Sequence, residues 1–233
     1  MCRRKNDVFI CLLLFDSRSF NMNFVKNNNI RLFHTNKNQN SLIEKKYNPQ
    51  KIVRIKQVHG NEIVNVNSNL ISSKPYEADA LISNQKNILL LIKTADCMPI
   101  FIYDKAGSGI GLVHAGWRGL KKGIAEKTVL LMSKQYGINV ADLFVYIGPS
   151  IRPCCYEVSE DFLGFFKGRY CNKREGKYFF DLCGYQKNAL INLGVPKKNI
   201  MDSDICTCCS TEYHSYRRDG DSAGRILSGI MLI

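Results

Sequence analysis

The sequence predicts an α+β fold, a single domain in which mixed β-sheets are flanked by helices. Short runs of β-branched and aliphatic residues, bounded by turn residues, are typical of buried strands, and they follow one another singly or as hairpins. Few segments carry the three- and four-residue apolar spacing of helices, so a strict strand–helix alternation is not expected. The 233 residues are 45% hydrophobic and show no linker rich in proline, glycine and serine, which favours one domain with a sizeable core.

The strand pattern is weak in the first fifty residues and clear from Ile52 onward. Ile52–Val58 and Ile63–Val66 predict a hairpin whose glycine-containing turn holds His59. A second hairpin is expected around the turn Ser83-Asn84-Gln85, between Ala80–Ile82 and Ile88–Ile92. The other predicted strands are Phe9–Phe15, Ile30–Phe33, Pro99–Tyr103, Ile110–Val113, Leu143–Ile147 and Ile226–Ile233. Of these, Pro99–Tyr103 leads through the turn Gly107-Ser108-Gly109 into Ile110–Val113 as a hairpin.

Three helices are expected between these strands. Apolar residues recur at helical steps from 120 to 136, and Gly137 stands where a helix-ending glycine belongs. A second helix is predicted from about Ser159. Asp181 is placed to cap a third helix that Gly194 ends.

The net charge of the chain and its distribution limit the classes of function that the sequence supports. The net charge is +13, but the basic residues form no known nucleic-acid module and are not interleaved with aromatic residues. A solvated surface rich in lysine and asparagine is therefore the preferred interpretation, with attraction of phosphorylated small molecules as the alternative. Neither a secretory leader nor the run of about 20 apolar residues of a membrane span is expected, which favours a cytoplasmic protein.

The ten cysteines do not indicate a disulfide scaffold in a chain of this size, so reduced thiols are expected. The spacings C-C and C-x-C-C are not the usual C-x₂-C of metal sites, and small buried thiols are favoured over a cysteine-rich metal site. The cysteines in question are Cys154, Cys155, Cys206, Cys208 and Cys209.

Three candidate metal ligands follow predicted strands. His59 and His114 each lie next to glycine, and Cys97 closes the stretch Thr94-Ala95-Asp96-Cys97. One cysteine and two histidines form a three-ligand zinc site whose fourth position is open to water. Their long separations suit a catalytic site assembled from several strand ends. Two loop histidines and a buried cysteine without metal are the alternative.

Four further residues carry charges that such a site can use. Asp96 is a candidate acid or base, or the cap of a turn. Arg118 precedes a predicted helix, where backbone N–H groups and the guanidinium can converge on an anion. Arg217 and Arg218 lie in a loop of glycine, aspartate and aromatic residues that suits phosphate or nucleoside binding, or is merely a charged surface loop.

These stretches resemble the YfiH-like family, which has been described both as a laccase-domain or polyphenol oxidase family and as purine nucleoside phosphorylases. The resemblance runs in order from residue 52 to the end and leaves 1–50 as a divergent N-terminal segment of the same domain, with 51–233 as the catalytic part. The matching stretches are Gln57-Val58-His59-Gly60, Ala78-Asp79-Ala80, Thr94-Ala95-Asp96-Cys97-Met98-Pro99, Val113-His114-Ala115-Gly116-Trp117-Arg118-Gly119, Ile147-Gly148-Pro149, Cys155-Tyr156-Glu157-Val158, Tyr216-Arg217-Arg218-Asp219-Gly220 and Gly224-Arg225.

The resemblance implies a YfiH-like fold and Zn²⁺ held by His59, Cys97 and His114. It implies phosphorolysis of adenosine, inosine and S-methyl-5′-thioadenosine, with purine nucleosides and phosphate as partners, and hydrolytic deamination of adenosine. Arg118, Arg217 and Arg218 are then candidates for substrate binding, and Asp96 for proton transfer. The oligomeric state stays open.

Three other functions remain on the sequence. Two histidines, a cysteine and the adjacent Met98 match the ligands of a single copper, although four histidines are too few for a multicopper centre. Cys97 with His59 or His114 suits a hydrolase or deamidase with a thiol nucleophile. The non-enzyme alternative is a basic protein that binds nucleic acid.

Overall fold

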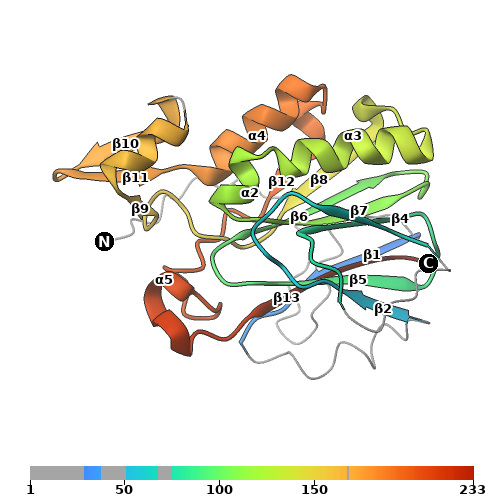
Figure 1. Ribbon diagram of the computed structural model, residues 1–233, viewed down its shortest axis with the longest axis horizontal. Coiled ribbons are helices and arrows are strands. Elements are labelled where there is room, and N and C mark those ends of the chain that lie inside the picture. Colours follow the sequence, from blue (N-terminus) through green and yellow to red (C-terminus); the bar gives the residue numbers. More distant parts are fainter. Residues whose placement is uncertain (1–28, 38–50, 68–74, 167) are drawn as a thin grey trace, which may run out of the picture.

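The computed structural model describes residues 29–37, 51–67, 75–166 and 168–233, and in this part of the chain the strands form three sheets (Figure 1). The orders are β1-β13-β5-β2, β12-β8-β6-β7-β4-β3 and β10-β11-β9. The mixed sheets and few helices confirm the predicted α+β class. The strands are β1 (Ile30–His34), β2 (Lys51–Arg54), β3 (Ile63–Val66), β4 (Ala80–Ser83), β5 (Ile88–Thr94), β6 (Met98–Asp104), β7 (Ile110–Ala115), β8 (Leu143–Ile147), β9 (Glu157–Val158), β10 (Cys171–Arg174), β11 (Lys177–Phe180), β12 (Ile200–Asp202) and β13 (Ile226–Leu232).

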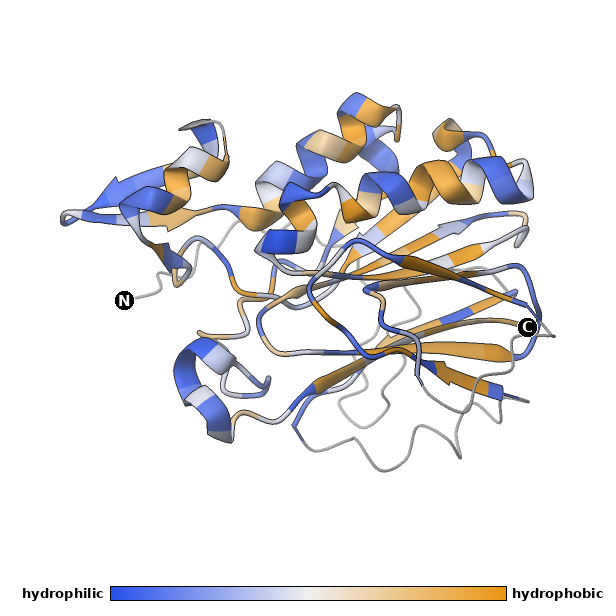
Figure 2. Cartoon of the chain, viewed as in Figure 1, coloured by the Kyte–Doolittle hydropathy of each residue, from blue (hydrophilic) through white to orange (hydrophobic). Residues whose placement is uncertain are grey.

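The two larger sheets pack face to face. Successive side chains of a strand point to opposite faces of its sheet, so the core is divided into two layers. Phe101 and Tyr103 of β6 join Leu90 of β5 between the sheets. Ile100 and Ile102 point to the opposite face of the six-stranded sheet, toward the helices. The strands of the two facing sheets accordingly carry many hydrophobic residues (Figure 2).

Helices cover the outer face of the six-stranded sheet (Figure 1). As predicted, the side chain of Asp181 accepts a hydrogen bond from the backbone N–H of Gly184, and Gly194, with φ of 111°, follows the end of α4. Gly137 ends α3 with φ of 67°. The α-helices are α2 (Trp117–Lys121), α3 (Ile124–Tyr136), α4 (Leu182–Leu193) and α5 (Tyr216–Asp219). None of the helices in the described ranges is both long and apolar enough to cross a membrane.

Two of the predicted helices differ from the structure. The single helix expected from 120 to 136 is two helices, because Gly123 adopts φ of 69°, which an α-helix cannot accommodate. The segment after Ser159 forms the 3₁₀ turns Glu160–Phe165. There the ring centroids of Phe162 and Phe166 lie 5.2 Å apart. Burial of these rings outweighs the intrinsic preference of the segment for an α-helix.

Both early hairpin predictions are wrong, and the error matters for the site. β2 pairs in parallel with β5 in one sheet, whereas β3 pairs in parallel with β4 in the other. Likewise β4 and β5 belong to different sheets. The loop that carries His59 therefore crosses from one sheet to the other. The later hairpin of β6 and β7 is confirmed.

The N-terminal segment contributes to the fold within residues 29–37. β1 lies antiparallel to β13, with Ile30 opposite Leu232 and His34 opposite Ser228. The predicted strand Ile30–Phe33 is thus confirmed as part of the four-stranded sheet. The predicted strand Phe9–Phe15 lies outside the described residues.

Candidate active site

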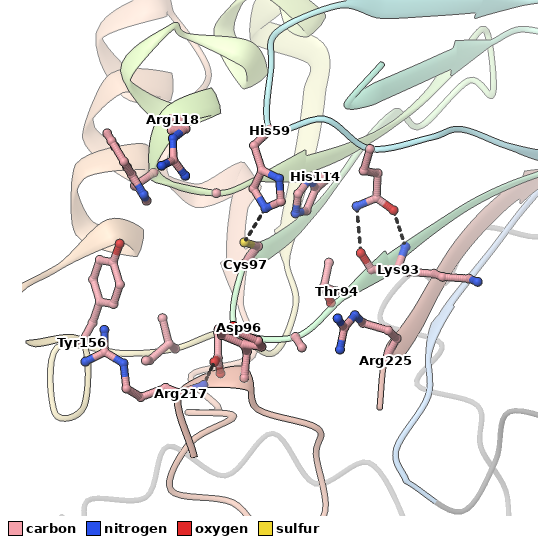
Figure 3. A pocket seen from close by; sticks show the side chains of 16 residues that line it. His59, Lys93, Thr94, Asp96, Cys97, His114, Arg118, Tyr156, Arg217 and Arg225 are labelled. Atoms are coloured by element: carbon pink, nitrogen blue, oxygen red, sulfur yellow. Dashed lines mark hydrogen bonds between the residues drawn. The ribbon is translucent and has the colours of Figure 1, made fainter. Parts of the chain in front are cut away.

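Three side chains that are distant in the sequence meet where the two large sheets adjoin. His59 comes from the loop between β2 and β3, Cys97 from the turn between β5 and β6, and His114 from β7. One ligand atom from each lies within 4.8 Å of the others (Figure 3). The Sγ of Cys97 is 4.0 Å from the Nε2 of His59, and the two imidazole rings meet edge to face with centroids 4.8 Å apart. The structure therefore brings together all three predicted metal ligands.

A buried carboxylate orients this group. Asp79 is fully buried and its Oδ1 accepts a hydrogen bond from the Nδ1 of His114 at 2.8 Å. The same carboxylate accepts backbone N–H bonds from Val58, His59 and Gly60 at 3.2, 3.0 and 2.6 Å. Burial raises the pKa of Asp79, but these bonds outweigh burial and lower it. Asp79 thus fixes the tautomer of one histidine and the backbone of the other.

The backbone around the site adopts conformations that are rare for residues other than glycine. His59 has φ of 57° and Asp96 has φ of 80°, both in the left-handed region. A Cβ on Gly116 would lie 3.0 Å from the Sγ of Cys97 and 3.1 Å from the Cδ2 of His59. Strain and close approach of this kind persist where the surrounding structure imposes them, which is common at functional sites.

The thiol and one imidazole form a charge-coupled pair. Burial opposes ionisation of Cys97, but hydrogen bonds from His114 and His59 outweigh it and lower its pKa to about 6. Burial also disfavours the charged form of His114, yet Asp79 and Cys97 raise its pKa to about 9. At neutral pH the metal-free site therefore holds a thiolate, the form in which cysteine binds metals and attacks electrophiles.

The donor set fits a tetrahedral metal with an open position. With metal–sulfur and metal–nitrogen bonds of about 2.3 and 2.0–2.1 Å, a tetrahedral site separates S and N ligands by about 3.6 Å. The 4.0 Å between Cys97 and His59 is close to that edge. A third protein ligand and an orienting carboxylate complete the pattern of catalytic zinc sites. Gly116 leaves room beside the two ligands.

The three ligands lie in a pocket of about 560 Å³ that is rich in cationic and aromatic side chains (Figure 3). The guanidinium of Arg118 stacks on Trp117 at 4.4 Å from the ring centroid, and that of Arg217 lies 5.6 Å from the ring of Tyr156. The lining residues are Gln57, His59, Lys93, Thr94, Ala95, Asp96, Cys97, His114, Gly116, Trp117, Arg118, Ile151, Tyr156, Tyr216, Arg217 and Arg225. The pocket thus offers flat apolar surfaces and positive charge around one reactive centre.

Asp96 lines the pocket, but its carboxylate is engaged elsewhere. Its Oδ1 accepts a hydrogen bond from Thr207 Oγ1 and its Oδ2 one from the backbone N–H of Arg217, both at 2.6 Å. The carboxylate therefore ties the first turn of α5 and the segment at 207 to the backbone beside Cys97. The two partners lie 111 and 121 positions away in the sequence, so the carboxylate cross-links distant segments and does not cap its own turn.

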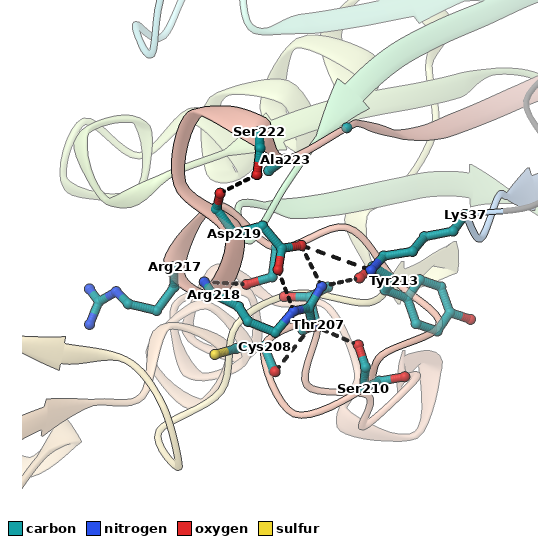
Figure 4. Close-up of polar contacts among 12 residues, drawn as sticks. Lys37, Thr207, Cys208, Ser210, Tyr213, Arg217, Arg218, Asp219, Ser222 and Ala223 are labelled. Atoms are coloured by element: carbon teal, nitrogen blue, oxygen red, sulfur yellow. Dashed lines mark hydrogen bonds and ion pairs between the residues drawn. The ribbon is translucent and has the colours of Figure 1, made fainter.

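Arg218 differs from the other predicted arginines. Its guanidinium donates to both carboxylate oxygens of Asp219 at 2.7 Å and to the backbone carbonyl of Tyr213 at 2.8 Å (Figure 4). It donates further to the carbonyls of Thr207, Cys208 and Ser210. These contacts hold a loop together, so the geometry does not support the predicted role of Arg218 in substrate binding.

Several pocket residues were not selected from the sequence. Asp79 precedes β4, and its role depends on a sheet register that motifs do not reveal. Gln57 is fixed by two hydrogen bonds with the backbone of Lys93, at 2.8 and 2.9 Å. Arg225 and Tyr156 line the pocket. Like Asp79 and Gln57, both stand in stretches that carry the family resemblance, and this was the signal that could have found all four residues.

Met98 is not placed to serve as a copper ligand. Its side chain is fully buried in the core beneath the helices, on the opposite strand face from Cys97. There its Sδ lies 3.4 Å from the Sγ of Cys183. The His₂Cys set therefore lacks the adjacent axial methionine that the sequence suggested.

Fold and site together define a class: an α+β protein with an open His–Cys–His centre in a basic pocket. The chain belongs to the family described as multi-copper polyphenol oxidoreductase laccase, whose model matches residues 16–233. The solved structure of the hypothetical protein YfiH from Bacillus licheniformis is 30% identical and superposes with a TM-score of 0.73 over 78% of this chain and 74% of that one. The predicted YfiH-like resemblance is confirmed.

Curated relatives carry names from nucleoside chemistry. A protein of Clostridium acetobutylicum named purine nucleoside phosphorylase is 36% identical over 192 residues, which cover 79% of this chain and 78% of the relative. A protein named adenosine deaminase RL5, from an unknown prokaryotic organism, is 35% identical over 161 residues, covering 65% of this chain and 61% of the relative. These names support an enzyme of this kind.

Proposed function

We propose that the protein is a zinc-dependent purine nucleoside phosphorylase that also deaminates adenosine. Its substrates would be adenosine, inosine or S-methyl-5′-thioadenosine with phosphate, and its products the purine base and the pentose 1-phosphate. The observation that carries the proposal is the convergence of His59, Cys97 and His114 in a pocket with aromatic walls and several cations. The names of the relatives support the nucleoside chemistry.

The metal would be held by His59, Cys97 and His114. Zn²⁺ bound there would supply a Lewis acid and lower the pKa of water to about 7, which suits hydrolytic deamination at neutral pH. Asp79 holds the Nδ1 proton of His114, so that the Nε2 of this ring is left to face the ligand group. Cys97 is already a thiolate at neutral pH, whereas His114, whose pKa is raised to about 9, would release its Nε2 proton when the metal binds.

Nucleoside and phosphate would occupy different walls of the pocket. The guanidinium of Arg118 and the ring of Phe165 both stack on Trp117, so a purine would pack against the Trp117–Arg118 stack and the ring of Tyr156. Lys93 and Arg225 supply positive charge on the strands β5 and β13 side, where phosphate would bind. A phosphate oxygen then bonds to C1′ as the bond from C1′ to the purine nitrogen breaks, and the proton lost by phosphate ends on the purine.

Asp96 would act as a positioning residue in this scheme. Its two short hydrogen bonds link Thr207 and the N–H of Arg217 to the backbone beside Cys97. The carboxylate thereby sets the distance between the metal ligand and the arginine on the opposite wall. Neutralising it in Asp96→Asn would raise the KM for the nucleoside while leaving the metal bound.

The test follows inosine and phosphate with zinc-loaded protein and measures free hypoxanthine and ribose 1-phosphate by chromatography. We expect phosphate-dependent release of both products, and loss of both in His59→Ala. Cys171→Ser, which changes a half-buried cysteine on β10, is the matched control and keeps activity. Zinc content measured alongside separates loss of metal from loss of chemistry. Absence of both products from zinc-replete protein would refute the proposal.

Oxidation of phenols by a single copper is the second candidate, because a His₂Cys donor set also suits copper. The position of Met98 argues against a copper site with an axial methionine. Copper-loaded protein that oxidises a phenol with oxygen, and zinc-loaded protein without phosphorolysis, would favour this candidate.

A further inference from the structure

A second group of metal-binding side chains lies outside the pocket centre. We propose that it is a second metal site, a tetrathiolate centre for Zn²⁺ that joins two loops beside the pocket, with the ligands Cys154, Cys155, Cys206 and Cys209. One sulfur from each lies within 4.8 Å of the others. The sequence interpretation as small buried thiols is wrong for this group, since Cys209 is exposed and Cys154 and Cys155 are half-buried.

The spacing of the sulfurs matches metal ligation. The Sγ of Cys209 lies 3.3 Å from that of Cys155 and 3.5 Å from that of Cys154. A disulfide holds its sulfurs about 2.05 Å apart. With zinc–sulfur bonds of about 2.3 Å, the edge of a ZnS₄ tetrahedron is about 3.8 Å. The measured separations lie near the tetrahedral edge and well above the disulfide length.

The sequence contains one cysteine pair with the spacing that is usual for zinc ligands, with a further cysteine between its two members. Cys206 and Cys209 stand three positions apart, which is a C-x₂-C pair with Cys208 as one of its intervening residues. The carbonyl of Cys206 accepts the N–H of Ser210 at 2.9 Å, so this pair lies on a tight turn. The third and fourth ligands come from the adjacent pair at 154 and 155.

The adjacent pair also lies on a tight turn. The N–H groups of Cys155 and Tyr156 both donate to the carbonyl of Arg152 at 2.9 Å, which closes the chain around the two cysteines. The turn packs against the other loop, because Ser150 forms a bridge with Cys206 and exchanges backbone hydrogen bonds with its neighbours. Two separate turns thus deliver two sulfurs each to one point, as in structural zinc sites, although Cys154 and Cys155 are adjacent where a C-x₂₋₄-C pair is usual.

Arginines hold the backbone around the four sulfurs. Arg174 donates to the carbonyl of Pro153 and Arg217 donates to that of Cys155 at 3.4 Å. Arg152 donates to the carbonyl of Ile205 at 3.3 Å. Four thiolates around Zn²⁺ carry a net charge of −2, and cationic side chains that bind the same loops offset part of it.

The centre would act on the pocket through the loops it joins. Tyr156 follows the first pair of cysteines directly and lines the pocket. Thr207 follows Cys206 and donates to Asp96, the residue beside the metal ligand Cys97. Arg217 reaches across to the carbonyls of Cys155 and Glu157. A bound ion at the four sulfurs would therefore fix one wall of the pocket without touching substrate.

The test counts zinc in protein purified under reductant, loaded with Zn²⁺ and desalted. We expect two ions per chain in the unmodified protein. One is retained by the double variant Cys154→Ser/Cys209→Ser and one by His59→Ala/His114→Ala, while Cys171→Ser, the matched control, retains two. A cysteine double variant that binds as much zinc as the unmodified protein would overturn the proposal, whereas loss of zinc from His59→Ala/His114→Ala would concern the open centre alone.

A second measurement covers the case in which the double variant does not fold. The folded His59→Ala/His114→Ala protein is loaded with Co²⁺, and its visible and near-ultraviolet spectrum is recorded. A tetrathiolate site gives intense sulfur-to-cobalt charge transfer and strong ligand-field bands of a tetrahedral ion, with one cobalt bound. A spectrum without these bands, or a Cys155–Cys209 disulfide found by peptide mapping of protein kept under reductant, contradicts the assignment. Neither readout depends on the proposed phosphorolysis.

Discussion

The two clusters of metal-binding side chains differ in their ligands, in their access to the pocket and in the groups that hold them in place. The loops at 154–156 and 206–209 nevertheless link the second cluster to the pocket of the first. The centre at His59, Cys97 and His114 offers three donors and opens into a pocket. The other offers four sulfurs on two turns. Zinc sites with three protein ligands and an open position are catalytic, whereas closed four-sulfur sites are structural. The comparison therefore separates where chemistry would happen from what would hold its surroundings in place.

The difference extends to how each cluster is oriented. The first depends on a buried carboxylate, Asp79, which binds one histidine directly and the backbone of the other. The second depends on local turns and on arginines that bind carbonyl groups. In the first arrangement the carboxylate tunes the basicity of a histidine ligand. In the second, the turns and arginines hold the loops rigidly.

The largest expected effect comes from removing a ligand of the open centre. His114→Ala should lower kcat/KM for phosphorolysis by more than about 100-fold, because loss of a direct ligand exceeds the 10–100-fold cost of losing its hydrogen-bond partner. Steady-state rates with zinc-replete protein measure this. His214→Ala, a histidine packed against Gly224, is the control that stays near the unmodified rate. Equal activity of both variants would remove the metal from the mechanism.

Asp79→Asn should weaken zinc binding at the open centre by about 10–100-fold, the range for loss of a carboxylate that holds a metal-binding histidine. The asparagine retains the shape, but with one oxygen it cannot accept the four hydrogen bonds that the two carboxylate oxygens of Asp79 accept. Competition with a chromophoric chelator measures the affinity. Glu77→Gln, an exposed carboxylate paired with Lys56, should leave the affinity unchanged.

Arg225 and Arg218 should separate binding from stability. Arg225→Ala should raise the KM for phosphate about 10-fold or more, since a hydrogen bond to a charged group contributes about 1.5–3 kcal/mol. Arg218→Ala should mainly lower the melting temperature, because this guanidinium binds Asp219 and several carbonyls of its own loop. Arg169→Ala, an exposed arginine stacked on Tyr170, is the neutral control. The reverse pattern would reassign the phosphate wall.

The tetrathiolate cluster should affect stability more than turnover. Cys154→Ser/Cys209→Ser should lower the melting temperature by at least about 2–4 °C, the shift that about 1 kcal/mol gives in a domain of this size. The kcat should change less than 10-fold, because these sulfurs do not line the pocket of the open centre. Calorimetry of zinc-loaded protein and steady-state kinetics check the two parts. A large loss of kcat with unchanged stability would reverse the roles assigned to the clusters.

The smallest effect is a shift in thiol reactivity. With metal removed, alkylation of Cys97 should accelerate as the pH rises through about 6, because the thiolate forms above its lowered pKa. Cys183 is the internal control, since burial raises its pKa to about 12. Peptide mapping after timed iodoacetamide treatment measures both. A midpoint for Cys97 near 8.5, the value of an ordinary thiol, would show that the histidines do not hold the thiolate.

Local chemistry carried most of the correct sequence predictions. The cap at Asp181, the glycine after α4 and the hairpin of β6 and β7 depend on neighbouring residues, and the structure confirms them. The partition of strands between two sheets depends on long-range pairing, so β2 and β3 were wrongly joined. Asp79 was missed for the same reason.

The cysteine pairs show a different limit. Cys206 and Cys209 have C-x₂-C spacing, but Cys208 lies between them and the sequence does not show that two further cysteines lie close by. Only the approach of the turn at 154 and 155 selects the pair. The three open-centre ligands could be selected because each follows a strand beside glycine or a turn. Arg218 resembled Arg217 in sequence, and only the hydrogen bonds in the structure separate them.

Phosphate-dependent cleavage of inosine tests the central claim most directly. The measurement compares zinc-loaded protein, the same protein stripped of metal, and His59→Ala in one assay, with zinc content determined for each sample. We expect hypoxanthine and ribose 1-phosphate in equal amounts from the loaded protein, with loss in the other two and recovery when zinc is returned to the stripped protein. Equal product from the loaded and stripped samples, or none from a fully loaded sample, would contradict it.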